Sequence, residues 1–542
     1  MKRSPINTAV RLGALNPATS MSLGMGTLAW GPSSAAAYAA AAITHPMRAA
    51  LVDDFGTITY LQLELRTSRV AAGLIHRGVD PDKPVGLLCR NHRGFVEANL
   101  ALAKLGARTV YLNPGLPTAQ LLTVIDRERI GAVVADADLL DQLHEANFGV
   151  ALISAAPELD SSWTFPDLSR WRPLLRLPTP LRTDDPVVLT SGTTGAPKGT
   201  TRRASAGSVA AVFGVLEAIP YTRGDVIVLP APLFHAWGLS QLLLAASLAG
   251  TVVLRRHFDP AVALDDVEAR GADVLAAVPV MLQRMLDSFD EADLSSLRIV
   301  ATSGSALPGD LATRWMDAAG PTLYSLYGST EVGQICVADP EMLSADSAVT
   351  GLPLRGVEVR IIDGSGNVLP SGAVGRVVAK SSMHFEGYTD GRTKEVIDSF
   401  MDSGDLGRLD TSGLLTVVGR ADDMIISGGE NIFPTNIERA ILGDPDVADA
   451  VAVGVADPEL GQRVRAVVVA AEGARLTSTG IRTRLRKELA RHEVPREIVI
   501  IDQLPRNASG KVLRSELIEP TATSDIKSDK KAKSRAQRKV TS

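Results

Sequence analysis

The sequence predicts an α/β protein: a large N-terminal domain of layered α/β subdomains, an added β subdomain, and a small α+β C-terminal domain. Three observations lead to this prediction. Strand-like and helix-like segments alternate from about residue 51, Gly-rich turns separate strand-like segments between residues 356 and 419, and both kinds of segment return beyond residue 422. Such alternation is typical of parallel strands covered by helices. A chain of 542 residues also exceeds one ordinary hydrophobic core, so two or more domains are expected.

Residues 1–50 precede this alternation, and we expect an irregular leader or a helix lying on the body of the protein. The chain begins with the basic Lys2 and Arg3, and residues 21–42 are rich in Ala, Gly and Met. Residues 30–34 interrupt the apolar run with Gly, Pro and Ser. Neither a signal peptide nor a membrane-spanning helix fits this pattern.

The N-terminal domain, predicted over residues 51–421, is expected to contain short buried strands followed by helices. The strand candidates are residues 86–89, 132–135, 186–189, 226–229 and 251–254. A helical pattern of Phe95, Asn99, Leu102 and Leu105 follows the first strand, and the apolar segment 239–248 separates the last two. Ligands of such open sheets bind at the carboxyl ends of the strands, where residues 190–199 and His235 are expected to lie.

Two further regions complete the predicted body. Residues 357–362, 375–379 and 414–418 predict an antiparallel β subdomain over about 352–419. Helix candidates at 436–442 and 479–491, with strand candidates at 450–455 and 465–470, predict the C-terminal domain over 422–520.

Composition excludes several classes of protein. The chain is 45% hydrophobic and 22% charged, as in globular proteins, and its net charge of −5 does not indicate a nucleic-acid-binding protein. Residues 521–542 carry seven Lys/Arg and two Asp, a net +5, so the rest of the chain carries −5 − 5 = −10. We expect this tail to be disordered and solvated, with weak contact to an anionic membrane surface as the alternative. Cys89 and Cys336 offer neither a disulfide framework nor metal-ligand spacing, which favours the reducing cytoplasm.

The segment after the strand candidate 186–189 is the most informative part of the sequence. It is rich in glycine, hydroxyl side chains and one lysine: Thr190, Ser191, Gly192, Thr193, Thr194, Gly195 and Lys198. Glycine allows backbone N–H groups to approach a ligand, hydroxyls add donors, and the lysine adds positive charge, which together suit a polyphosphate. The Gly-Lys-Ser/Thr ending of a Walker A loop is missing. A Gly/Ser/Thr-rich surface loop is the alternative.

This segment resembles the phosphate-binding loop of the adenylate-forming (ANL) superfamily, which includes acyl-CoA synthetases, luciferases and the adenylation domains of peptide synthetases. Further segments resemble that family in its own order: residues 232–238, 303–308, 327–331, 403–405, 419–423 and 505–511. The resemblance covers roughly residues 50–518. It implies a large N-terminal domain, a hinge at Asp422 and a mobile C-terminal domain.

The resemblance also implies roles for individual residues. The loop would hold the β- and γ-phosphates of ATP, Thr330 would bond the α-phosphate, and Glu331 would ligate Mg²⁺. Tyr327 and Gly328 would lie at the adenine, with Gly304, Ser305 and Ala306 lining that side. Asp405 would accept hydrogen bonds from the ribose hydroxyls, and Arg420 would reach the ribose or a phosphate.

Three residues concern the chemical steps. Lys511 would bridge the attacking carboxylate and the α-phosphate during adenylate formation. Gly429 would line the tunnel for the pantetheine arm of coenzyme A. His235 would lie between the acyl pocket and the thiol entry, although a histidine packed in the core remains the alternative.

The expected activity is that of a fatty-acid:CoA ligase, which uses ATP, Mg²⁺ and coenzyme A. Small apolar residues on the expected acyl side favour a fatty acid: Ala231, Gly238, Leu239, Gly304 and Ala306. An acyl-AMP ligase that loads a carrier protein and a non-catalytic binding relative are the alternatives. Arg376 and Met401 depart from the family pattern, which leaves the subfamily open. We expect a cytoplasmic protein, with a peripheral place at the membrane and a homodimer left open.

Overall fold

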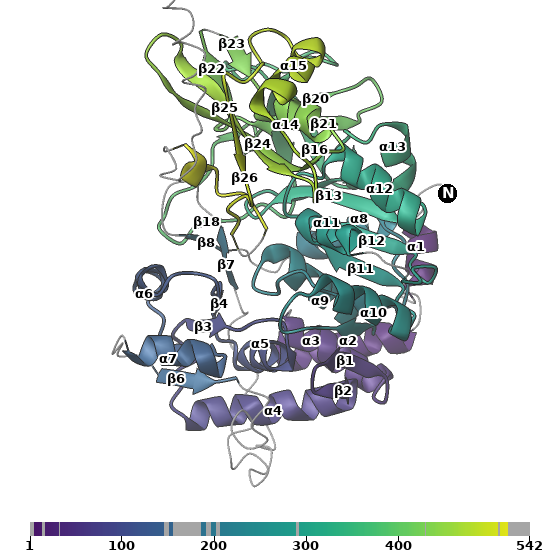
Figure 1. Ribbon diagram of the computed structural model, residues 1–542. Coiled ribbons are helices and arrows are strands. Elements are labelled where there is room, and N and C mark those ends of the chain that lie inside the picture. Colours follow the sequence, from purple (N-terminus) through teal and green to yellow (C-terminus); the bar gives the residue numbers. More distant parts are fainter. Residues whose placement is uncertain are drawn as a thin grey trace, which may run out of the picture. The chain divides into compact units, whose positions relative to one another are not determined.

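The computed structural model describes residues 5–12, 17–31, 33–145, 151–155, 186–190, 197–201, 206–288, 292–428, 430–507 and 510–518 (Figure 1). The chain divides into two compact units. The first comprises Met1–Met424 with Arg506–Lys511, and the second Ile425–Pro505 with Val512–Ser542. The first boundary therefore falls between Met424 and Ile425. The boundary predicted from the sequence lies three residues earlier, between residues 421 and 422.

The described residues of the leader are helical, which is the second of the two alternatives expected from the sequence. It contains α1 (Pro5–Arg11), α2 (Pro17–Trp30) and α3 (Ser34–Thr44). Alanine, the strongest helix former, makes up most of α3, and burial of Ala35, Ala36 and Tyr38 fixes this helix on the body. Helix α2 packs on α3 at Gly26, where an added Cβ would lie only 2.4 Å from the carbonyl oxygen of Ala36. Glycine therefore permits the two helices to approach closely.

The larger sheet of the first unit is parallel in its middle. Among the described residues its order is β15 (Leu352–Pro353), β14 (Gly333–Ala338), β13 (Leu323–Ser329), β12 (Ile299–Thr302), β11 (Val274–Ala277), β9 (Val226–Val228), β10 (Thr251–Val253), β1 (Ala49–Asp53) and β2 (Gly56–Thr59). The strands from β13 to β1 pair in parallel, and β14, β15 and β2 are antiparallel additions at the two edges.

Helices accompany this sheet, as expected for parallel strands that need crossover connections. They are α8 (Ala206–Ala218), α9 (Ala236–Ser247), α10 (Pro260–Arg270), α11 (Pro279–Asp287), α12 (Gly309–Ala319) and α13 (Pro340–Ala345). The strand expected at 226–229 corresponds to β9, and most of the apolar segment 239–248 lies in α9.

A second sheet of the first unit carries the predicted phosphate loop. Its order in the described part is β18 (Gly387–Tyr388), β8 (Lys198–Thr201), β7 (Val187–Thr190), β4 (Thr109–Tyr111), β3 (Val85–Leu88), β5 (Ala132–Ala135) and β6 (Ala151–Ser154). Its helices are α4 (Tyr60–His76), α5 (Arg93–Leu105), α6 (Thr118–Arg127) and α7 (Ala137–Glu145). Strands β7 and β8 pair antiparallel, and residues 191–196 connect them.

An antiparallel sheet completes the first unit. It consists of β16 (Glu358–Ile362), β17 (Gly375–Lys380), β20 (Phe400–Leu409), β19 (Val396–Ile397) and β21 (Leu415–Arg420). Gly351 links it to the larger sheet: its backbone pairs with Leu415, and an added Cβ would lie 2.1 Å from the carbonyl carbon of Val337. The φ angle of +113° at Gly351 also favours glycine.

The second unit is a smaller α+β body with its own core. It contains β22 (Ile425–Ser427), β23 (Glu430–Ile432), α14 (Pro434–Leu442), β24 (Val447–Asp457), β25 (Gly461–Ala470), α15 (Ser478–Glu488), β26 (Glu497–Ile501) and a 3₁₀ helix (Arg514–Leu517). Ile437, Ile441, Val468 and Leu485 are fully buried or nearly so within it. The α/β class, with a large N-terminal and a smaller C-terminal part, is confirmed. Within the described residues, no helix is both long and apolar enough to cross a membrane.

Candidate active site

A cavity of about 1000 Å³ lies in the first unit, at the carboxyl ends of its strands. The segments that follow β9, β11, β12 and β13 place His235, Val278, Gly304 and Thr330 on its wall. This is the edge at which ligands of open α/β sheets bind. Motifs far apart in the sequence, from Lys198 to Arg420, thus meet at one hollow.

The hairpin of β13 and β14 carries the Gly-Ser-Thr-Glu part of the Tyr-Gly-Ser-Thr-Glu segment to the cavity, whereas Tyr327 does not line it. Gly328, Thr330 and Glu331 line the cavity there. Gly328 lies so close to the opposite strand that an added Cβ would be 2.2 Å from the carbonyl oxygen of Gly333. A side chain at position 328 would therefore force the hairpin apart and displace the two residues that follow.

Tyr388 connects Glu331 to the strand that starts at Lys198. Its hydroxyl donates a 2.8 Å hydrogen bond to Oε1 of Glu331, and Nζ of Lys198 lies 5.4 Å from its ring centroid. Burial and the neighbouring carboxylate raise the pKa of Tyr388, so the phenol remains a donor. The sequence analysis did not select Tyr388; its two-residue strand, β18, has no periodic pattern that could have revealed it.

Asp405 is a buried carboxylate that does not itself line the cavity but lies next to Gly404, which does. Its side chain accepts a 2.5 Å hydrogen bond from the hydroxyl of Tyr327, and a guanidinium nitrogen of Arg420 lies 3.4 Å from its other oxygen. The pKa of Asp405 is raised because burial disfavours the charged form, although Arg420 opposes that effect. The acid predicted to bind ribose is thus held between a phenol and a cation.

Two cations reach the cavity because Gly404 has no side chain. An added Cβ at Gly404 would lie 3.1 Å from Arg420 and 3.2 Å from Nζ of Lys394, and its φ of +83° is a left-handed conformation. Lys394 also donates a 2.8 Å hydrogen bond to the carbonyl oxygen of Ser403 and lines the cavity. Lys394 was not predicted, since it lies in no motif.

His235 lines the cavity at the residue before α9. Its Nε2 atom is shielded from solvent and has no hydrogen-bond partner within the described part of the chain. Burial lowers the pKa of His235 to about 4, so the ring is neutral at physiological pH. An unpartnered polar atom at a cavity wall is more consistent with contact to a ligand than with simple core packing.

Lys511 lies in the short segment Arg506–Lys511, which groups with the first unit. Asn507 shapes that segment, because its side-chain oxygen accepts from the backbone N–H of Lys511 at 2.9 Å. Lys511 lines the cavity, as do Lys198 and Arg420. The structure therefore provides the cavity with several cations, which suits a ligand with many negative charges.

Other predicted residues lie elsewhere or outside the described residues. Ser305 and Ala306 are exposed and do not line the cavity, and Ala231 is fully buried in the core rather than at the acyl side. Thr190 ends β7, whereas Ser191, Gly192, Thr193, Thr194, Gly195 and Gly429 lie outside the described residues.

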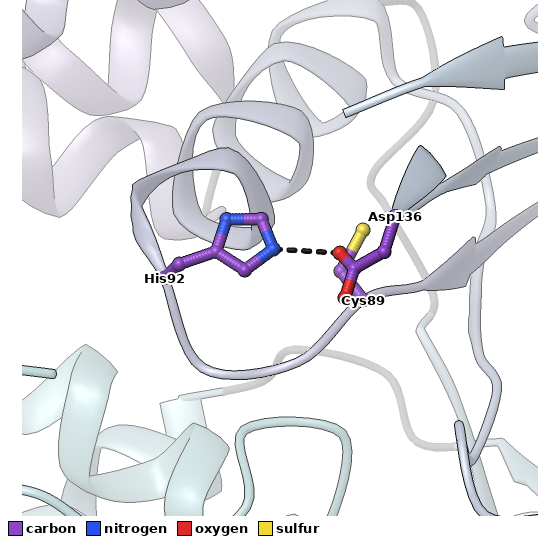
Figure 2. A group of neighbouring side chains, drawn as sticks. All are labelled: Cys89, His92 and Asp136. Carbon is purple, nitrogen blue, oxygen red and sulfur yellow. Dashed lines mark hydrogen bonds and ion pairs between the residues drawn. The ribbon is translucent and has the colours of Figure 1, made fainter. Parts of the chain in front are cut away.

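A second cluster of chemically active side chains, Cys89, His92 and Asp136, is buried near the start of α5 (Figure 2). Nδ1 of His92 accepts a 3.0 Å hydrogen bond from the backbone N–H of Gly94. The ring proton is therefore on Nε2, which donates a 2.6 Å hydrogen bond to Asp136. Arg90 also donates to Asp136, at 2.8 Å.

These bonds already satisfy the cluster. A metal ion would have to displace the His92 proton and would face the guanidinium groups of Arg90 and Arg256, which both pair with Asp136. Burial also raises the pKa of the Cys89 thiol, which disfavours the thiolate that metals bind. We therefore interpret this cluster as a structural network that joins the ends of β3 and β5 to α5.

Comparison with known proteins identifies the class to which this fold and this cavity belong. The profile of the AMP-binding enzyme family matches residues 38–389, and that of the AMP-binding enzyme C-terminal domain matches residues 436–511. The chain belongs to this family of adenylate-forming enzymes. The family identified from the sequence is thereby confirmed.

Individual relatives cover most of the chain. A feruloyl-CoA synthase from Amycolatopsis sp. is 34% identical over 472 residues, which are 85% of this chain and 93% of the relative. A 2-succinylbenzoate–CoA ligase from Bacillus anthracis is 31% identical over 477 residues, covering 87% and 95%.

Solved structures agree with this grouping. The o-succinylbenzoate CoA synthetase MenE from Bacillus subtilis, in complex with the acyl-adenylate intermediate, has a TM-score of 0.77 at 26% identity and covers 89% of this chain and 98% of its own. ATP-bound MatB from Rhodopseudomonas palustris has a TM-score of 0.79 at 26% identity, with 90% and 98% covered. ATP, Mg²⁺ and coenzyme A, the cofactors expected from the sequence, are those of enzymes of this family.

Proposed function

We propose that this chain is an AMP-forming acid–CoA ligase that activates an aromatic carboxylic acid. The observation that carries the proposal is the convergence of Glu331, Arg420 and Lys511 on one cavity that also has an apolar wall from Trp237 and Leu239. Its volume of about 1000 Å³ reaches the upper range for ligand sites, as the binding of a nucleotide together with an organic acid requires.

In the first half-reaction, a carboxylate oxygen attacks the α-phosphorus of ATP, and the bond from that phosphorus to pyrophosphate breaks. Catalysis of such a transfer rests on positioning and charge neutralisation. Lys511 would neutralise charge between carboxylate and α-phosphate, and Thr330 would orient that phosphate. The residues of the phosphate loop, 190–198, would hold the leaving pyrophosphate.

The residues of the site fit a magnesium ion. One oxygen of Glu331 is held by Tyr388, which leaves the other oxygen of this carboxylate for a cation beside phosphate oxygens. When bound, Mg²⁺ supplies neutralisation of the charge on the phosphates. Asp405 would accept hydrogen bonds from the ribose hydroxyls through its two carboxylate oxygens, of which one accepts from Tyr327 and the other pairs with Arg420 in this structure.

In the second half-reaction, the sulfur of coenzyme A attacks the acyl carbon, and the bond from that carbon to AMP breaks. Gly429 would leave room for the thin pantetheine arm, and His235 would stand between acid and thiol.

We also propose that Asp422 is the hinge between the two half-reactions. An Asp422→Pro variant should then slow the overall reaction, and full activity in that variant would remove the hinge from the proposal.

The relatives favour an aromatic acid, because feruloyl-CoA synthase and 2-succinylbenzoate–CoA ligase are named for such acids. A fatty acid is the second candidate, favoured by the small or aliphatic side chains of Gly238, Leu239 and Gly304 at the cavity. The acceptor has alternatives too: a carrier protein, or an amine as in the amide bond synthetase McbA from Marinactinospora thermotolerans, which is 27% identical.

Acid-dependent ATP–pyrophosphate exchange tests the proposal directly. We expect exchange with ferulate, 2-succinylbenzoate or benzoate at kcat/KM at least about tenfold above that with octanoate or palmitate. A higher kcat/KM with octanoate or palmitate would indicate that the substrate is a fatty acid. If the adenylate persists in the presence of coenzyme A but is consumed when a phosphopantetheinyl carrier protein is added, the acceptor would be a carrier protein. Absence of exchange across the whole panel would leave a non-catalytic binding protein.

A further inference from the structure

Helix α2 exposes large apolar side chains to an unusual extent. None of its fourteen residues is charged, and the exposed fractions are 67% for Met21, 51% for Met25 and 80% for Leu28. Single exposed apolar residues are normal on a soluble protein, but a continuous set marks an interaction surface. These three residues are spaced at i, i+4 and i+7, so they lie on one side of the helix.

The packing of the leader directs that side outward. Ser22 and Gly26 are the buried residues of α2, and Gly26 packs against Ala36 of α3. Helix α3 lies on the body through its alanines, and α2 lies beside it (Figure 1). Ile43 at the end of α3 is 51% exposed and, with Met21 and Met25, lines a hollow of about 620 Å³. The apolar surface thus extends over two helices.

Cations border this hollow. Arg223 lines it beside His45 and donates to Thr19 of α2 at 2.8 Å. Burial lowers the pKa of both His45 and Arg223, and the nearby positive charge of Arg48 lowers both further. Neither arginine forms an ion pair with a carboxylate within the described residues. Their charges therefore remain available to an external anion.

The sequence of the leader has the same bias. Residues 1–52 contain Lys2, Arg3, Arg11 and Arg48 and no Asp or Glu, a net +4 in a chain whose total is −5. The remaining 490 residues (542 − 52) consequently carry −5 − 4 = −9. Positive charge beside exposed Met, Leu and Ile suits the surface of a bilayer that contains anionic lipids, which offers headgroup phosphates above an apolar interior.

We propose that one face of the leader binds the surface of a membrane that contains anionic lipids. This surface, here called the leader face, is formed by Met21, Met25, Leu28, Ile43, Arg48 and Arg223. The apolar side chains enter the region between headgroups and acyl chains, and the arginines bind headgroup phosphates. A second copy of this chain fits less well, because residues 1–52 contain no Asp or Glu that could pair with the arginines of a partner copy in a two-fold contact. The proposal does not depend on the proposed catalytic function.

Vesicle flotation of the full chain tests the proposal, with phosphatidylcholine vesicles compared with mixed phosphatidylcholine–phosphatidylglycerol vesicles. We expect partition onto the mixed vesicles to exceed that onto neutral vesicles about tenfold and to weaken at high salt. A Met21→Ser/Met25→Ser/Leu28→Ser variant should lose at least about tenfold of the binding. An Arg48→Gln/Arg223→Gln variant should lose the preference for phosphatidylglycerol.

Matched substitutions of exposed residues outside the leader are the controls. Val368 is 61% exposed and Arg475 is also exposed, so a Val368→Ser/Arg475→Gln variant should bind vesicles as the unchanged protein does. Undiminished binding by the triple serine variant would overturn the proposal and assign binding to another part of the chain, such as the basic residues 521–542. Absence of vesicle binding by the unchanged protein would also overturn the proposal. If light scattering shows a dimer, and the triple serine variant is monomeric, the leader face would instead bind a second copy of the chain.

Discussion

The hydroxyl of Tyr388 donates a hydrogen bond of 2.8 Å to Oε1 of Glu331, and these two residues come from different sheets of the first unit. Glu331 follows the last strand of the parallel series, β13, whereas Tyr388 belongs to the edge strand β18. The bond therefore orients the proposed magnesium ligand from outside its own hairpin. Groups that orient a metal ligand in this way commonly contribute strongly to metal affinity.

We expect Tyr388→Phe to raise the Mg²⁺ concentration needed for half-maximal ATP–pyrophosphate exchange about tenfold, since Glu331 would lose its fixed orientation. Titration of exchange activity with Mg²⁺ measures this. Tyr60→Phe is the control, because it removes a similar 2.7 Å bond, to the carbonyl oxygen of Gly250, from a tyrosine that does not line the cavity. Equal magnesium titrations for the unchanged protein and Tyr388→Phe would contradict a positioning role.

The buried carboxylate of Asp405 gives a second prediction. Asp405→Asn keeps the size of the side chain but removes the negative charge that faces Arg420 and would accept ribose hydroxyls. We expect the KM for ATP to rise about tenfold or more with a smaller change in kcat. Steady-state kinetics at varied ATP measures this, and Asp363→Asn in an exposed turn should leave KM unchanged. A loss confined to kcat would argue against nucleotide binding by Asp405.

Lys511 separates the two half-reactions. We expect Lys511→Ala to reduce adenylate formation by at least about a hundredfold, because the charge that develops at the α-phosphate would lose its cation. The variant should still form thioester from supplied acyl-AMP and coenzyme A. Lys487→Ala on the exposed side of α15 should leave both steps intact. Comparable loss in both half-reactions would mean that Lys511 serves the fold rather than the first step.

Gly429→Leu should give the converse result. A side chain at this position would fill the proposed path of the pantetheine arm, so acid-dependent pyrophosphate exchange should continue while thioester formation falls at least about tenfold. Gly443→Leu, at an exposed position of the same unit with a φ of −65° where an added Cβ would come no closer than 3.6 Å to its neighbours, controls for the introduction of a leucine at a glycine. Normal thioester formation by Gly429→Leu would exclude that path.

His235 predicts a dependence of stability on pH. Its pKa falls to about 4 on folding from a usual value near 6.5, so the unfolded chain binds the extra proton between these values. Stability therefore decreases as pH falls through this window, by about 1–2 kcal/mol from about pH 7.5 to pH 5 for this group. His235→Phe should remove that part of the loss in urea unfolding. Identical pH dependence in both proteins would contradict burial of a neutral imidazole.

The strands that could be predicted from sequence are those with continuous apolar runs. Residues 86–89, 132–135 and 226–229 correspond to β3, β5 and β9, because a buried parallel strand needs apolar residues on both faces. Strand β18 has two residues and is defined only by pairing with β8, which no local pattern reveals. The sequence left the leader open between an irregular segment and a helix, because its glycine and proline residues suggested irregularity. Close packing of α2 on α3 at Gly26 stabilises helices there.

Site residues within motifs were easier to predict than those that reach the cavity through tertiary packing. Thr330 and Glu331 follow strand β13, so their positions at the cavity agree with the rule for open sheets. Lys394 lies outside any motif and reaches the cavity beside Gly404. Ser305 and Ala306 lie one and two residues beyond Gly304, yet the chain has already turned away to solvent there.

The close backbone contact at Gly351 limits how parts of this enzyme can be exchanged with those of relatives. Position 351 has no room for a side chain against Val337, and its backbone pairs with Leu415. The three positions therefore form one close contact, here called the seam, in which a change at one position requires changes at the others. A hybrid that takes the β subdomain from another family member should inherit all three from the same parent. Splices placed within this seam would yield insoluble proteins even when every catalytic group is retained.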